Sequence, residues 1–161
     1  MQRGLEIAKQ NGVTTILNPA PAAELPDAVY QLSDYFTPNE TEAAMLTGMP
    51  VATEEQAEVA AIRLLQRGVQ TVIITLGEKG AYVCNSEVRQ SIPSFDMGDR
   101  VVETTGAGDA FNGGFVRALA EGQPLIEAVR FGSATAALSV TGYGTAPSMP
   151  TEKEIRALLA S

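Results

Sequence analysis

The segment Thr71–Leu76 constrains the fold more than any other part of the sequence. It reads TVIITL, so it is almost entirely apolar or β-branched. A run of this kind is typical of a strand buried on both faces, and such strands occur in parallel sheets that are covered by helices. The apolar spacing from Ala57 to Leu65 predicts a helix directly before this strand. We therefore expect an α/β chain.

Periodicity and turn residues place the remaining elements. Capping-box patterns begin at Thr53 and Thr151, and Pro124 suits the first turn of a helix. The pattern predicts a three-layer α/β/α (Rossmann-like) fold with a mostly parallel sheet and helices on both faces. Ligand loops are then expected at the carboxyl ends of strands, after Phe36, Leu76 and Val102. The expected strands are 14–17, 35–37, 71–76, 81–84 and 87–92. The expected helices are 2–10, 39–48, one from 53 that is capped by Gly68, 108–119, 124–141 and one from 151 onward.

Composition excludes several classes of function. The chain has 161 residues, a size that suits a single domain, and a net charge of −8, which disfavours nucleic-acid binding. It contains no histidine, so no His-based triad or His-ligated zinc site can be built within it. Cys84 is its single cysteine. With no apolar run of membrane-spanning length and no secretory signal in the first residues, we expect a cytoplasmic protein without a membrane partner.

The strongest chemical motif is TTGAGDAF at residues 104–111. Small residues before a helix let backbone N–H groups approach an anion, and the helix N-terminus favours negative charge. The motif lacks the Lys of a Walker A loop. Asp109 can be a first-turn carboxylate that stabilises the helix, or a base that accepts the proton of an attacking hydroxyl. The spacing alone leaves both interpretations open.

Three weaker motifs each have a structural and a functional interpretation. Asn39 with Glu42 forms a capping-box pattern, but it can also meet phosphate and a hydrated Mg²⁺. The glycines of 75–80 suit a tight turn or a nucleotide-facing loop. Residues 139–148 form a Gly-rich helix end, which can simply end a helix or expose carbonyl groups to a cation.

Together and in this order, these motifs resemble the C-terminal half of the ribokinase-like carbohydrate kinases, the PfkB family. The resemblance covers essentially the whole chain, and its most specific part is TTGAGD followed by AFNGG. The segments Asn18–Pro21, 37–43 and 144–150 favour the ribokinase branch of the family. The resemblance implies ATP-dependent phosphoryl transfer to the primary hydroxyl of a sugar, with D-ribose favoured.

The resemblance also implies roles for individual residues. Asp109 matches the catalytic base, and the anion hole is matched by Gly106, Ala107 and Gly108. Glu42 matches the acidic residue linked to Mg²⁺. The positions that match ATP contacts are Asn39, Thr75, Leu76, Gly77, Glu78, Lys79, Gly80, Gly108, Asp109 and Ser133. The positions that match ligands of a monovalent cation (K⁺) are Glu103, Thr105, Ser139, Gly142, Gly144 and Ser148.

The sequence departs from the family pattern in four respects. Glu103 replaces the usual Asp, Gly142 stands where a basic residue is common, and Ser133 stands where Asn or His often contacts the nucleotide. The N-terminal portion with most sugar contacts and the β lid have no counterpart, so the fold is incomplete relative to the family. We therefore expect a homo-oligomer or a complement of the missing half. A non-catalytic nucleotide-binding fragment and a structural remnant are the alternatives.

Overall fold

The computed structural model describes residues 1–161 and groups them into two compact units. Unit 1 comprises residues 1–76 and 82–91, and unit 2 comprises residues 77–81 and 92–161. The prediction that all 161 residues form one domain stays a prediction. None of the helices has the length and hydropathy that crossing a membrane requires.

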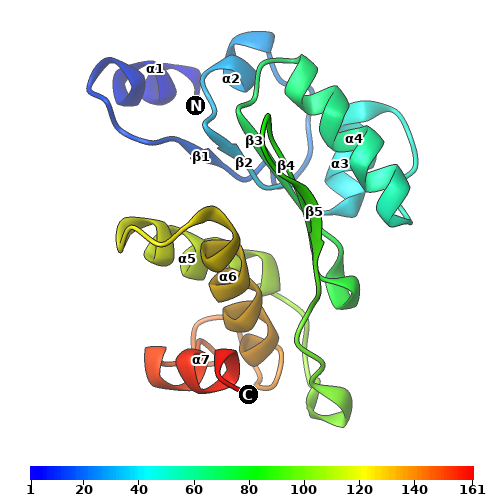
Figure 1. The fold of residues 1–161 in the computed structure, drawn as a ribbon, viewed down its shortest axis with the longest axis vertical. Helices are drawn as coiled ribbons and strands as arrows, with labels where there is room; N and C mark the ends of the chain where they lie inside the picture. The colour runs from blue at the N-terminus through cyan, green and yellow to red at the C-terminus, as the bar shows by residue number, and fades with distance from the viewer. The chain divides into compact units, whose positions relative to one another are not determined.

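A five-stranded sheet runs in the order β1-β2-β3-β4-β5 (Figure 1). Strands β1 and β2 are parallel, with Ile16 opposite Tyr35, and β2 and β3 are parallel, with Phe36 opposite Val72. All five predicted strands are present, but the first two are shortened to two residues each, the third ends at Thr75 and the fifth begins at Arg89. The strand bounds are β1 Ile16–Leu17, β2 Tyr35–Phe36, β3 Thr71–Thr75, β4 Ala81–Cys84 and β5 Arg89–Ile92.

Strand β3 lies at the centre of the apolar core of unit 1. Its residues Val72, Ile73 and Ile74 are fully buried, as the TVIITL run predicts. Phe36 of β2 and Leu64 of the preceding helix are also fully buried and belong to the same core cluster as Val72. Burying aliphatic and aromatic side chains of this size is the main favourable term in the free energy of folding.

The helices of unit 1 largely follow their predicted caps. The side chain of Asn39 caps α3 and Gly48 ends it in the left-handed conformation. Thr53 caps α4, but the Gln56 side chain accepts a hydrogen bond from Ala52 N–H, so the predicted reciprocal box is displaced by one residue. The short helix α2 was not predicted, because no side chain caps it. The helix bounds are α1 Gln2–Gln10, α2 Asp27–Gln31, α3 Glu40–Thr47 and α4 Glu54–Gln66.

Unit 2 is built on two helices that pack side by side, α5 (Ala107–Ala120) and α6 (Leu125–Ser139) (Figure 1). A Cβ atom on Gly114 of α5 would lie 2.3 Å from the Thr135 hydroxyl, so only glycine permits this approach. Helix α6 begins after Pro124, which is the N-cap rather than a first-turn residue. The unit also contains two 3₁₀ turns, η1 (Gly77–Lys79) and η2 (Gly98–Arg100).

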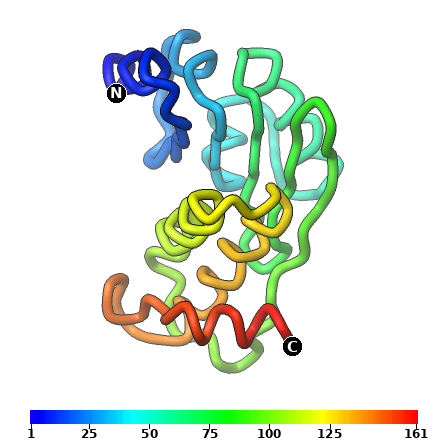
Figure 2. The backbone as a smooth tube through the Cα atoms, turned by 60° about the vertical axis from the view of Figure 1, so that its left-hand side comes forward, coloured from blue at the N-terminus to red at the C-terminus, as the bar shows by residue number.

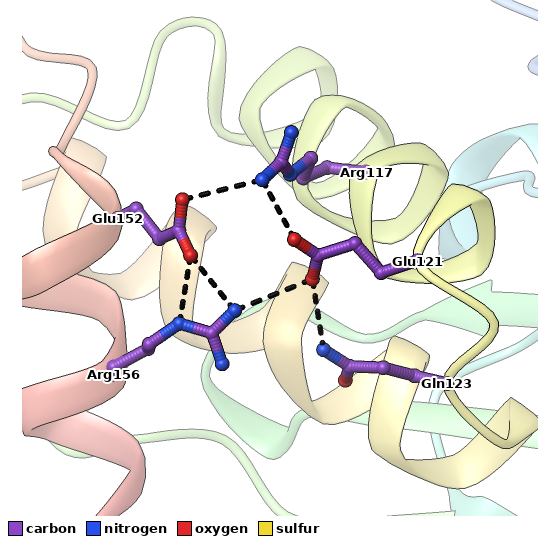
Figure 3. Close-up of polar contacts among 5 residues, drawn as sticks. All are labelled: Arg117, Glu121, Gln123, Glu152 and Arg156. Carbon is purple, nitrogen blue, oxygen red and sulfur yellow. Dashed lines mark hydrogen bonds and ion pairs between the residues drawn. The ribbon is translucent and has the colours of Figure 1, made fainter.

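Helix α7 (Glu152–Leu159) is joined to α5 by a network of charged side chains (Figure 3). The Arg117 guanidinium contacts Glu121 at 2.6 Å and Glu152 at 3.3 Å. The Arg156 guanidinium contacts the same two carboxylates, at 3.3 Å and 2.8 Å, and Gln123 donates to Glu121. The start of α7 is the predicted capping box at Thr151. Figure 2 shows the backbone of the loop that leads from α6 into α7.

Candidate functional site

The predicted anion hole lies at the start of α5, in the turn Gly106–Gly108. Gly106 is the N-cap of the helix and has φ +82°, which is why glycine suits this position. The amide groups of Gly108 and Asp109 lie in the first turn, where helix geometry offers N–H groups no intrahelical acceptor. The Ala107 amide already donates to the Thr104 carbonyl at 3.2 Å. Of the three predicted anion-hole residues, Ala107 therefore has an N–H that is already engaged within the protein.

Asp109 is exposed in the first turn of α5. It lies at one wall of an open groove of about 290 Å³ that runs along α5. The groove is mostly apolar, with Phe131 and Ile155 among its lining residues and with Arg117 and Glu152 as its other charged ones. Sequence reasoning missed the groove, because its walls depend on how three successive helices, α5, α6 and α7, pack against one another. The carboxylate of Asp109 is thus open to a partner molecule.

The segment before α5 is fastened to the Gly-rich loop at residues 142–148. The Gly144 N–H donates to the Glu103 carboxylate at 3.0 Å. Hydrogen bonds from the Gly144 amide and from Thr105 hold the pKa of Glu103 below its ordinary value. A Cβ atom on Gly106 would lie 2.8 Å from the Thr145 methyl group, so the loop also rests on the first glycine of the anion turn.

The residues predicted as cation ligands are only partly brought together. A hydrogen bond links Glu103 with Gly144, Thr105 contributes to the lowered pKa of Glu103, and a Cβ atom on Gly142 would lie 3.2 Å from the Ser148 Cβ. Ser148 donates its hydroxyl to the Thr145 carbonyl at 3.2 Å. The buried hydroxyl of Ser139 donates instead to the Ala136 carbonyl, in the last turn of its own helix α6.

In unit 1, Asn39 and Glu42 form the reciprocal capping box of α3. The Glu42 N–H donates to the Asn39 side chain at 2.8 Å, and the Asn39 N–H donates to the Glu42 carboxylate at 2.8 Å. Glu42 is buried, with 7% of its surface exposed. The structural interpretation of this motif is therefore confirmed. Their contacts with nucleotide and Mg²⁺ stay predictions.

Asn39 also lies beside the end of β3. It forms a parallel bridge with Thr75, and the Thr75 N–H donates to the Pro38 carbonyl at 3.0 Å. The carboxyl ends of β2 and β3 thus bring two predicted nucleotide residues together, as the parallel sheet requires.

The predicted loop continues into unit 2 as the turn η1. The Gly80 N–H donates to the Gly77 carbonyl at 3.1 Å, and the Ser94 hydroxyl donates to the Glu78 carbonyl. A Cβ atom on Gly80 would lie 2.0 Å from the Ile92 carbonyl oxygen, so the tight-turn interpretation holds. Ser133, the last predicted nucleotide contact, is a buried residue of α6.

Comparisons with known proteins identify the family. The family model described as "pfkB family carbohydrate kinase" matches residues 1–152 of this chain. The chain is 50% identical to a ribokinase of Haemophilus influenzae over 149 residues, and 41% identical to a ribokinase of Staphylococcus aureus over 151 residues. These alignments cover 92% and 93% of this chain but 48% and 49% of the relatives, so the chain spans about half their length.

A solved structure shows the same fold. The Arabidopsis thaliana ribokinase complexed with ribose and ATP superimposes with a TM-score of 0.92 at 36% identity, over 98% of this chain and 51% of that one. The anion turn of α5, the Asn39–Thr75 pair and the mostly parallel sheet thus occur in a fold shared with these enzymes. The chain belongs to the PfkB family of carbohydrate kinases.

Proposed function

We propose that this chain supplies the nucleotide site and the proton acceptor of an ATP-dependent sugar kinase. The observation that carries the proposal is the exposed carboxylate of Asp109 in the first turn of α5, directly after the anion turn of Gly106–Gly108. The identity to relatives named ribokinase supports D-ribose as the acceptor of the whole enzyme. The resulting product is ribose 5-phosphate.

In this reaction Asp109 acts as the general base. The oxygen of the sugar's primary hydroxyl forms a bond to the γ-phosphorus, and the bond from that phosphorus to the β–γ bridging oxygen breaks. The hydroxyl proton passes to the Asp109 carboxylate, and ADP leaves. The first-turn amides of Gly108 and Asp109 stabilise the negative charge on the phosphoryl oxygens, with the N-terminal end of the helix dipole.

The remaining predicted residues bind the nucleotide. Asn39, the 75–80 loop and Ser133 would contact ATP, by resemblance to the family. Mg²⁺ neutralises phosphate charge when it is bound, and it needs few protein ligands because it keeps most of its waters. We assign this role to Glu42: its Oε2 accepts the hydrogen bond from the Asn39 N–H, and its Oε1 would meet a metal-bound water. The resemblance also implies K⁺ near Glu103. In the structure, however, the Glu103 carboxylate accepts a hydrogen bond from the Gly144 N–H.

The proposal includes a partner. Because the relatives are about twice as long, the contacts that position the sugar would come from a further portion of protein or from a second copy of this chain. Positioning of this kind can supply about 7–11 kcal/mol of barrier lowering, so Asp109 alone does not ensure turnover. Localisation in the cytoplasm stays a prediction.

A second candidate function is a nucleotide-binding module without turnover. The observation that favours it is the groove beside Asp109, whose lining is mostly apolar and therefore offers few hydrogen bonds to sugar hydroxyls. Such a module would bind MgATP through the residues named above and release no ADP.

Two measurements on the same chain separate these functions. Isothermal titration calorimetry measures the binding of MgATP. A coupled assay of ADP release, with D-ribose or 2-deoxy-D-ribose as acceptor, measures phosphoryl transfer. Binding with ribose-dependent ADP release supports the kinase. Binding without release excludes a kinase formed by this chain alone and leaves the non-catalytic module or a kinase half that needs the further portion of protein. The absence of both would contradict a nucleotide site in this chain.

A further inference from the structure

Glu103 joins two segments of unit 2 that are far apart in the sequence. Its carboxylate accepts a hydrogen bond from the Gly144 N–H at 3.0 Å, 41 residues further along the chain. The backbone reinforces the same junction, since the amides of Val102 and Glu103 both donate to the Val140 carbonyl, at 2.8 Å and 3.2 Å. The segment that enters α5 is thereby tied to the segment that leaves α6.

The bonded glycine belongs to a turn that reaches the anion site. The Ser148 N–H donates to the Gly144 carbonyl at 3.3 Å, so the loop is closed by its own backbone. Between these residues, Thr145 packs against Gly106, where an added Cβ would meet its methyl group at 2.8 Å. Fixing Gly144 therefore fixes Thr145 on the N-cap of α5.

The donor set at this junction does not fit an alkali cation. Such cations are bound by oxygen atoms, whereas Gly144 directs its N–H toward the Glu103 carboxylate, and its carbonyl accepts a hydrogen bond from the Ser148 N–H. Glu103 is also one methylene longer than an aspartate, and this length lets it reach the Gly144 amide directly.

We infer that Glu103 is a positioning residue whose carboxylate fastens the 142–148 loop beside the start of α5, so that the order of this loop does not require a monovalent cation. The effect on turnover rests on the proposed function, because it acts through Gly106 and the anion turn. The order of the loop does not rest on it. A test that reads the loop thus distinguishes failure of this inference from failure of the kinase assignment.

Hydrogen exchange of the Gly144 amide, followed by NMR, tests the inference on the whole chain. The rate is compared in potassium chloride and in tetramethylammonium chloride at equal ionic strength. We expect the same rate in both salts. Slower exchange of this amide in K⁺, with a saturable dependence on its concentration, would overturn the inference.

Variants separate the reach of the side chain from its charge. In Glu103→Asp the shorter carboxylate falls short of the amide, so exchange at Gly144 is expected to rise about three- to tenfold. Glu103→Gln keeps the reach with a weaker, neutral acceptor and should retain more protection than the aspartate variant. Glu127→Asp, at an exposed carboxylate of α6, is the matched control and should leave the rate unchanged.

An unchanged Gly144 rate in Glu103→Asp would also overturn the inference. Amides of α5 and α6 away from the loop report whether each variant is folded. If Glu103→Asp does not fold, the comparison of the two salts on the unmodified chain still decides.

Discussion

Gly106 and Thr145 meet across the entrance to α5, although they are far apart in the chain. Gly106 has φ +82°, and a Cβ atom there would lie 2.8 Å from the Thr145 methyl group. Gly106→Ala therefore combines an unfavourable backbone conformation with a steric clash. We expect a loss of about 1–3 kcal/mol in the free energy of unfolding, measured by urea denaturation, and weaker binding of MgATP in calorimetry.

Gly113→Ala is the control for this prediction. Gly113 lies inside α5, and an added Cβ would meet nothing within 4 Å. Alanine favours the helix there, so the free energy of unfolding should stay unchanged or rise by about 0.5–1 kcal/mol. Equal stability of the two variants would contradict the contact between Gly106 and the loop.

Asp34 anchors the first strands of unit 1. Its carboxylate accepts hydrogen bonds from Lys9 and from the amide and hydroxyl of Thr15, the latter two at 2.8 Å and 3.0 Å. Burial raises the pKa of Asp34, but the hydrogen bonds from Lys9 and Thr15 together outweigh it and leave the pKa below its ordinary value. Asp34→Asn is expected to cost about 1–3 kcal/mol of unfolding free energy.

The lowered pKa of Asp34 also has a pH consequence. A carboxyl whose pKa is lower in the folded state stabilises the protein above its unfolded pKa, and this stabilisation is lost as the pH falls through the folded pKa. Below pH 3.8, the ordinary pKa of this carboxyl, we expect the free energy of unfolding of Asp34→Asn to fall less steeply with falling pH than that of the unmodified chain. Urea denaturation across this acid range checks it, with the exposed Asp99→Asn as control. The same acid slope in both variants would refute the role of Asp34.

Tyr82 is expected to control stability at alkaline pH. Its side chain is 3% exposed, and burial, followed by the charges of Glu58 and Cys84, raises its pKa to about 12. Between the unfolded value of 10.0 and about 12, the folded state binds the proton more tightly. Stability therefore falls as the pH rises through this range.

Tyr82→Phe removes the titrating group and should reduce that alkaline loss of stability in denaturation experiments. Tyr143→Phe is the control, because Tyr143 is 79% exposed. An alkaline slope that is unchanged in Tyr82→Phe would show that Tyr82 is not the group responsible.

Local patterns predicted much of the fold. The TVIITL run gave strand β3, and Asn39 and Thr151 correctly marked the starts of α3 and α7 because a cap is decided by residues close in sequence. Helix α2 escaped prediction because it has five residues and no capping side chain. The grouping into two compact units also had no sequence signal, since it depends on which helices and strands pack together.

In the candidate site, too, the features that are local in the sequence could be predicted and those that depend on packing could not. The glycine turn and helix start around Gly106 and Asp109 could be predicted because they lie in one short motif, and the structure confirms both. Anion binding there stays a prediction. The bond from Gly144 to Glu103 could not be predicted, because it depends on where the loop after α6 returns in space. The groove beside Asp109 likewise depends on the packing of α5, α6 and α7.

The most direct test of the proposed function is the rate of ADP release from MgATP with D-ribose, in the unmodified chain and in Asp109→Asn. The variant keeps the size of the side chain and removes the proton acceptor. We predict ribose-dependent release that falls about 10²–10⁴-fold in Asp109→Asn, with unchanged MgATP binding. The exposed Asp99→Asn should retain full activity. Ribose-dependent release that persists at the same rate in Asp109→Asn would contradict the role of Asp109 as the base.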